Sequence, residues 1–123
     1  MIFHISKSFD PYFNLALEEV FLRERDDDVF MLWQNAPTVV IGKNQNAYAE
    51  VDLAYAEKNG IRVARRLSGG GAVYHDMGNL NYSYIASGGG TLDFARFEAP
   101  IIAALSRVGV SASFRLSSYS LFL

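Results

Sequence analysis

Three consecutive glycines, Gly69, Gly70 and Gly71, constrain the fold of this chain more than any other feature of its sequence. Residues 61–65 alternate in the manner of a strand before them, and residues 72–75 return to an extended pattern after them. Because glycine has no Cβ atom, such a loop can adopt unusual φ and ψ angles and approach a ligand closely. Backbone N–H groups that are freed in this way can point at an anion.

The residues on either side of the glycines favour an anion-binding loop over a plain hairpin. Arg65 and Arg66 add fixed positive charge and planar donors that suit phosphate or carboxylate. The loop is not a P-loop, since no lysine–serine or lysine–threonine pair follows the glycines. The dinucleotide fingerprint requires glycine or alanine where Tyr74 stands, and a helix instead of a strand afterwards. A glycine-rich hairpin without a ligand stays the alternative, but the arginines together with His75 and Asp76 make it less favoured.

Two helices are expected in the first half of the chain. Asp10 can cap a helix and Pro11 suits its first position, and apolar residues recur at helical spacing to about Arg25. Asp52 predicts the cap of a second helix, which Gly60 terminates. The residues expected to face the core from the first helix are Phe13, Leu17, Val20 and Phe21.

A third helix is expected after the glycines at positions 88–90, with Thr91 as its cap and Gly109 as its end. Because hairpin-like and helical connections are mixed, we expect an α/β (α+β) fold with a mixed, largely antiparallel sheet flanked by helices. Strands are expected at residues 2–6, 30–33, 37–42, 61–65, 72–75 and 80–85, and the apolar face of the third helix at Phe94, Phe97, Ile101, Leu105 and Val108.

The composition excludes several classes of function. The 123 residues include no cysteine, which excludes disulfides, thiolate metal sites and a cysteine nucleophile within them. Two isolated histidines offer no metal-ligand spacing, and the net charge of -2 gives no polyanion footprint. No apolar run approaches the ~20 residues that span a bilayer, and the start lacks the pattern of a signal peptide. We therefore expect a cytoplasmic protein with no metal ligands and with neither nucleic acid nor membrane as a partner.

The run RRLSGGGAVYHDMGN at residues 65–79 is similar to a segment that lipoate–protein ligases carry. That segment reads arginine-arginine-x-serine, three glycines, alanine-valine-tyrosine-histidine-aspartate-x-glycine-asparagine. NLALEE at residues 14–19 resembles the first helix of the family, and residues 32–35 and 39–46 (LWQN and VVIGKNQN) extend the similarity. The resemblance holds in continuous register over about residues 1–113.

The resemblance implies an α/β catalytic domain related to biotin ligases and class II aminoacyl-tRNA synthetases. It implies that ATP, accompanied by Mg2+, activates lipoate to lipoyl-adenylate. A lysine of a lipoyl carrier domain, in 2-oxoacid dehydrogenase complexes or the glycine cleavage H protein, then receives the lipoyl group. Residues 1–113 would be the N-terminal part of this catalytic domain and residues 114–123 a divergent tail.

The resemblance also implies roles for individual residues. Trp33 and Val40 each have two interpretations, as part of the wall of the acyl channel or as an ordinary core residue, and for Val40 the second is favoured. ATP and the adenylate phosphate would be bound by Arg66, Gly71, Ala72, Val73 and Tyr74. The same pocket would be lined by Ser68, Gly69, Gly70, His75, Asn79 and Trp33.

After Ser113 the sequence departs from the family pattern. The family continues with a hairpin whose glycine-lysine-lysine segment holds the catalytic lysine, whereas this sequence has no lysine after Lys58. No catalytic residue is therefore implied within the chain. Three hypotheses stay open. The first is that the chain is the N-terminal half of a ligase. The second is that it is a non-catalytic binding remnant, or one part of a split ligase that a separate chain completes. The third, less favoured, is an octanoyl transferase of the same fold. A partly uncovered sheet edge would also favour self-association.

Overall fold

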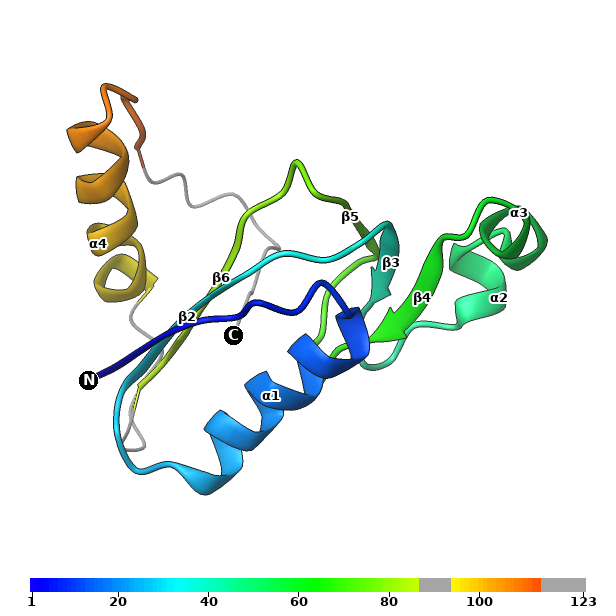
Figure 1. The fold of residues 1–123 in the computed structure, drawn as a ribbon, viewed down its shortest axis with the longest axis horizontal. Coiled ribbons are helices and arrows are strands. Elements are labelled where there is room, and N and C mark those ends of the chain that lie inside the picture. Colours follow the sequence, from blue (N-terminus) through cyan, green and yellow to red (C-terminus); the bar gives the residue numbers. More distant parts are fainter. Residues whose placement is uncertain (87–93, 114–123) are drawn as a thin grey trace. The chain divides into compact units, whose positions relative to one another are not determined.

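The computed structural model describes residues 1–86 and 94–113, which fall into two units (Figure 1). Residues 1–86 hold six strands and three helices, and residues 94–113 hold one further helix. The expected glycine loop at residues 88–90, the Thr91 cap and the tail at residues 114–123 lie outside the described residues.

The first sheet has the strand order β1-β2-β6. β1 (Ile2–Ile5) pairs in parallel with β2 (Val29–Trp33), and β2 pairs antiparallel with β6 (Asn81–Ile85). Two parallel neighbours need a crossover connection, and α1 (Pro11–Glu24) provides it (Figure 1). The first helix of the chain is therefore built into the sheet topology.

The second sheet has the order β4-β3-β5 and repeats this arrangement. β3 (Thr38–Ile41) pairs in parallel with β4 (Arg62–Arg65) and antiparallel with β5 (Val73–His75). The crossover from β3 to β4 contains α2 (Ala47–Glu50) and α3 (Leu53–Lys58). The expected mixed α/β class is confirmed. Each sheet contains one parallel and one antiparallel pair, so parallel pairing has a larger share than the sequence predicts.

The two helix starts expected in the first half of the chain are confirmed. The Asp10 carboxylate accepts the backbone N–H groups of the second and third residues of α1, at 2.8 and 3.3 Å. Asp52 caps α3 in the same way, and Gly60 follows that helix with a φ of +66°. The short helix α2 is not predicted by the sequence pattern, although Asn46 caps it with its side chain.

The core of the first unit lies between the first sheet and α1. Alternation along β2 buries its first, third and fifth residues, and these pack with one residue of α1 and one of β6. Ile2, Leu15 and Leu17 pack around this cluster. The members of the cluster are Phe21, Val29, Met31, Trp33 and Ile85.

The residues expected to form the buried face of α1 are only partly correct. Phe21 is buried, but Phe13 and Val20 are 53% and 48% exposed. Pro11 and Asn14 take the buried positions near the start of the helix instead. Hydrogen bonds of the Asn14 amide, described below, turn a polar residue inward and override the apolar pattern.

The second unit contains α4 (Phe94–Arg107), which is the third expected helix. Gly109 has a φ of +82°, and the Val110 N–H donates to the Leu105 carbonyl at 2.9 Å, which closes the helix end. Val108, expected on the apolar face, follows the helix and is 75% exposed. In the part of the chain that the structure describes, no helix is long and apolar enough to cross a membrane.

Met31 provides a test of this core. Its side chain is fully buried at the centre of β2, so Met31→Ala should lower the free energy of unfolding by about 2–5 kcal/mol. Leu22→Ala is the matched control, because Leu22 is 53% exposed on α1 and should change stability by about 0.5 kcal/mol or less. Urea unfolding measures both. Equal losses in the two variants would contradict this assignment of the core.

Candidate functional site

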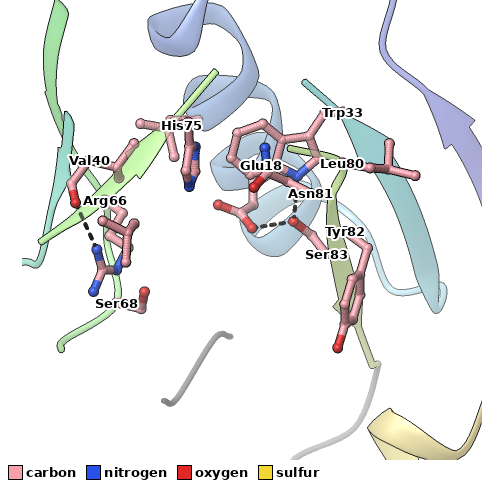
Figure 2. A pocket seen from close by; sticks show the side chains of 12 residues that line it. Glu18, Trp33, Val40, Arg66, Ser68, His75, Leu80, Asn81, Tyr82 and Ser83 are labelled. Atoms are coloured by element: carbon pink, nitrogen blue, oxygen red, sulfur yellow. Dashed lines mark hydrogen bonds between the residues drawn. The ribbon is translucent and has the colours of Figure 1, made fainter. Parts of the chain in front are cut away.

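A pocket of about 180 Å³ lies in the first unit, lined by residues of both sheets and of α1. Figure 2 shows two groups of side chains that face each other. One wall comes from α1, β2 and the start of β6, and the other from β3, β5 and the loop after β4. The first wall consists of Leu15, Glu18, Trp33, Leu80, Asn81, Tyr82 and Ser83, and the second of Val40, Arg66, Ser68, Val73 and His75.

The structure brings together some of the residues implied by the resemblance. Val40 is 1% exposed, as its core interpretation expects, and it also lines the pocket. The implied residues that line the pocket are Trp33, Arg66, Ser68, Val73 and His75. Those that do not line it are Gly69, Gly70, Gly71, Ala72, Tyr74 and Asn79.

Arg66 is only 8% exposed, and its guanidinium holds the glycine loop from within. Nη2 donates to the carbonyls of Gly69 and Gly71 at 2.8 and 2.7 Å, and Nε donates to Gly69 at 3.2 Å. Nη1 donates to the Val40 carbonyl of β3 at 3.2 Å (Figure 2). A guanidinium has five N–H donors, which leaves one on Nη1 without a partner in residues 1–86 and 94–113.

The three glycine carbonyls all turn toward the protein. Those of Gly69 and Gly71 accept from the guanidinium, and the Gly70 oxygen approaches Gly42 so closely that a Cβ there would lie 2.1 Å from it. In a trans peptide the carbonyl and the next N–H point in opposite directions. The N–H groups of Gly70, Gly71 and Ala72 therefore point away from these contacts, and none donates within the described part of the chain. Successive free N–H groups form a concavity that can bind an anion.

Arg65 and Gly42 support this loop from the neighbouring turn. Arg65 Nη1 donates to the carbonyls of Gly42, Lys43 and Gln45 at 2.9, 3.1 and 2.7 Å. The Lys43 N–H donates to the Ser68 carbonyl at 2.9 Å, which ties the two loops together. The adjacent arginines, taken together in the sequence as an anion-binding pair, are divided: Arg66 lines the pocket, whereas Arg65 braces the turn beside it.

Glu18 is a site residue that sequence reasoning did not single out. It accepts the Ser83 hydroxyl at 2.5 Å, and the same Ser83 oxygen accepts the Trp33 indole N–H at 3.0 Å (Figure 2). Burial raises the pKa of Glu18, and the Ser83 hydrogen bond and the charge of Arg66 oppose this shift. The available signal was its spacing, because Asn14 and Glu18 are four residues apart and share one helix face.

Asn81 and Ser83 at the start of β6 were missed as well. They occupy alternate positions of the strand and line the pocket from the same wall as Glu18. Asn81 Nδ2 is buried and has no hydrogen-bond partner among the described residues. The pocket wall therefore contains a donor that the rest of the described chain leaves unsatisfied, which costs folding free energy.

His75 lies on the opposite wall and is 8% exposed. Its ring packs against the Trp33 ring with centroids 5.7 Å apart and planes at 65°. Burial lowers the pKa of His75, and the nearby charge of Arg66 lowers it further. Burial also lowers the pKa of Arg66, but a guanidinium stays charged at neutral pH. The pocket thus combines one fixed positive charge with an imidazole that is neutral at neutral pH.

The fold is that of an α/β domain, and its pocket contains the buried guanidinium of Arg66. The chain belongs to the family whose model is described as the lipoyl protein ligase A/B catalytic domain, which matches residues 10–119.

Individual relatives support this membership. The chain is 48% identical over 107 residues to lipoate-protein ligase LplJ of Bacillus subtilis (strain 168), which is 84% of this chain and 32% of that protein. A crystal structure of lipoate-protein ligase A bound with ATP has a TM-score of 0.82 at 31% identity, over 100% of this chain and 54% of the other. A bi-partite lipoate protein ligase from Thermoplasma acidophilum, studied with its E2 lipoyl domain, has a TM-score of 0.82 at 31% identity. This match covers 94% of this chain and 48% of the other. The chain spans about a third of the length of the curated relative.

Glu18 and His75 should give the stability of the protein two opposing dependences on pH. The raised pKa of Glu18 gives stability that is present below its ordinary value of 4.5 and is lost as pH rises through the raised value. The lowered pKa of His75 gives stability that is present above its ordinary value of 6.5 and is lost as pH falls toward the lowered value. The two effects oppose each other at mildly acidic pH.

Glu18→Gln should therefore make stability fall more steeply as pH decreases from 6.5 toward 4.5, and His75→Gln should make it fall less steeply. Each change is at most about 1.4 kcal/mol per pH unit, the value for one proton. Urea unfolding at several pH values measures the slopes, with His4→Gln, the only other histidine of the sequence, as the control. If both variants have the same slopes as the unsubstituted protein, Glu18 and His75 do not contribute to the pH dependence of stability.

Gly42 and Gly71 form a matched pair for testing the loop. Gly42→Ala places a Cβ against the Gly70 oxygen and forces the backbone to shift, at a cost of about 1–3 kcal/mol. A Cβ at Gly71 meets nothing within 4 Å, and among the three loop glycines only Gly70 has a positive φ, of +96°. Gly71→Ala should therefore leave stability unchanged or raise it by about 0.5 kcal/mol. Chemical unfolding compares the two, and a larger loss at Gly71 would refute this geometry.

Proposed function

We propose that this chain supplies the nucleotide-binding and acyl-binding part of a lipoate–protein ligase. In the first step a carboxylate oxygen of lipoate attacks the α-phosphorus of ATP, and pyrophosphate leaves. In the second step the amine of a carrier lysine attacks the carbonyl carbon of lipoyl-adenylate, and AMP leaves. We assign residues 1–113 to the N-terminal part of the catalytic domain.

The observation that carries the proposal is the donor set of the glycine loop. Three successive N–H groups have no acceptor within the described residues, and the buried guanidinium of Arg66 binds the carbonyls opposite two of them. This arrangement suits the α-phosphate of ATP and the phosphate of the adenylate, since both are tetrahedral anions with several oxygen acceptors. In the proposal the phosphate is bound by Arg66, Gly71, Ala72, Val73 and Tyr74.

The charges of the pocket favour one orientation of the acyl group. Arg66 lies on one wall and Glu18 on the other, so a carboxylate is attracted toward the first and disfavoured near the second. The acyl chain then lies along Leu15, Trp33 and Val40. We propose that Ser68, Gly69, Gly70, His75, Asn79 and Trp33 complete the surroundings of the bound adenylate.

A pocket of about 180 Å³ is smaller than the ~300–1,000 Å³ that usually encloses a small-molecule ligand. Residues beyond those described are therefore expected to complete the site. This agrees with the comparison above, in which the chain spans about a third of the length of its curated relative. We assign no catalytic residue to the chain. Magnesium enters the proposal as the ion that accompanies ATP. In residues 1–86 and 94–113 no three His, Asp or Glu side chains could hold a metal ion together.

The carrier in the proposal is a lipoyl domain, as found in 2-oxoacid dehydrogenase complexes or the glycine cleavage H protein. The support is the Thermoplasma acidophilum ligase, which was studied with its E2 lipoyl domain. The related proteins reported above are ligases, which favours the ATP-dependent reaction over octanoyl transfer.

Arg66→Ala tests the proposed phosphate contact. Loss of a charge-assisted hydrogen bond should weaken binding of a non-hydrolysable lipoyl-adenylate analogue by about 1.5–3 kcal/mol, measured by calorimetry on the 123-residue chain. Arg62→Ala removes the same charge from β4, the strand that precedes Arg66. Arg62 is exposed and paired with Asp10 at 3.4 Å, so this control should bind normally. Unchanged affinity in Arg66→Ala, or an equal loss in both variants, would argue against the contact.

A further inference from the structure

A chain of buried amides leads from α1 to the ring of His75 and begins at Asn14, which is fully buried. Asn14 Oδ1 accepts the Ser6 hydroxyl at 2.6 Å. Asn14 Nδ2 lies 3.0 Å from the Ser8 carbonyl and 2.9 Å from the Gln34 carbonyl. Backbone carbonyls only accept hydrogen bonds, so these two contacts fix which end of the Asn14 amide is nitrogen.

The second amide in the chain is Asn35, which is also fully buried. Its Oδ1 lies 3.0 Å from Asn14 Nδ2. Asn14 Nδ2 has two hydrogens for three acceptors, so one hydrogen is shared, as often happens in hydrogen-bond networks. The reverse orientation of Asn35 would place two NH₂ groups against each other with no acceptor between them. The orientation of Asn35 is therefore fixed by that of Asn14.

The third group in the chain is the imidazole. Asn35 Nδ2 lies 3.2 Å from His75 Nδ1. Since an amide NH₂ only donates, His75 Nδ1 must accept and cannot carry a hydrogen. A neutral imidazole then holds its hydrogen on Nε2, and an imidazolium would place two donors face to face. Arg66 also disfavours the charged ring.

His75 Nε2 is the atom that remains available. It has no hydrogen-bond partner within the described residues, and it is not among their buried unpartnered atoms, so it keeps contact with solvent. His75 lines the pocket, and Nδ1 is the nitrogen turned toward the buried Asn35.

We propose that Asn35 is a positioning residue that holds His75 as the neutral Nε2–H tautomer, and that His75 presents a fixed hydrogen-bond donor to the pocket. A protonated Nε2 cannot remove a proton from a ligand, so His75 binds an acceptor and does not act as a general base from this nitrogen. An acceptor of fitting chemistry is an anionic oxygen, carboxylate or phosphate. Its assignment to lipoyl-adenylate rests on the proposed function, whereas the tautomer does not.

The tautomer can be read without any ligand. Long-range ¹H–¹⁵N correlation spectra of the ¹⁵N-labelled 123-residue chain show which ring nitrogen is protonated, and His4→Gln leaves His75 as the only histidine. At pH 7 we expect the Nε2–H form of His75 to exceed the Nδ1–H form by about tenfold or more. A dominant Nδ1–H form, an even mixture or an imidazolium would overturn the proposal.

A variant tests whether Asn35 is the cause. Asn35→Asp replaces the donor with a carboxylate that only accepts, so His75 should move to a form with hydrogen on Nδ1. Asn35→Leu removes the contact and should reduce the preference toward a mixture, which gives a second measurement if the carboxylate prevents folding. An unchanged Nε2–H spectrum in a folded variant would show that Asn35 does not hold the ring.

Addition of the non-hydrolysable lipoyl-adenylate analogue separates this inference from the proposed function. Binding with a shift of the His75 Nε2 resonance and with the tautomer retained supports both. Binding without any change at Nε2 would overturn the donor role of His75 and leave the proposed function intact. Failure of the analogue to bind would count against the proposed function, while the ligand-free spectrum would still decide the tautomer.

Discussion

The buried guanidinium of Arg66 is the interaction on which the candidate site depends. It joins β3, through the Val40 carbonyl, to both ends of the glycine loop. A buried charge is costly unless hydrogen bonds compensate it, and here the carbonyl oxygens of three residues do so. The same contacts turn the loop carbonyls inward, which leaves the opposite N–H groups free. One side chain therefore stabilises the loop and determines its chemical character.

The charge of Arg66 also affects the groups that face it. It lowers the pKa of both Glu18 and His75, but burial acts on these two groups in opposite directions. For the carboxyl group burial outweighs the charge, and the neutral form becomes more favoured. For the imidazole burial and charge act together, and the neutral form is favoured again. Arg66 is therefore the fixed positive charge of the pocket and the electrostatic partner that it offers to an anionic ligand.

Features encoded in a few adjacent residues could be predicted from the sequence. Asp10, Asp52 and Gly60 mark helix ends through local hydrogen bonds and φ preferences, and the structure places them as expected. The glycine loop lies between two strands as predicted, because its flanking alternation is also local.

Features that depend on distant partners could not be predicted in this way. Asn14 is buried because backbone carbonyls of two separate segments accept from its amide, and no periodicity reports this. Gly42 matters because of the Gly70 oxygen, 28 positions later in the chain, and Glu18 because of Ser83. The role of Arg65 could not be predicted either, because its acceptors lie in the turn after β3, far away in the sequence. Pocket residues such as Glu18 and Ser83 could not be predicted, because they meet only in the folded state.

The pairing of β2 with β6 has a consequence for the order in which the molecule assembles. Trp33 and Ser83, hydrogen-bonded within the pocket, are 50 residues apart in the chain. Contacts between residues so far apart in the sequence close a long loop and are slow to form, so the pocket should be complete only late in folding. A ligand that recognises the finished pocket does not bind the unfolded chain. Its binding free energy is then added to the stability of the whole first unit, and not to the glycine loop alone.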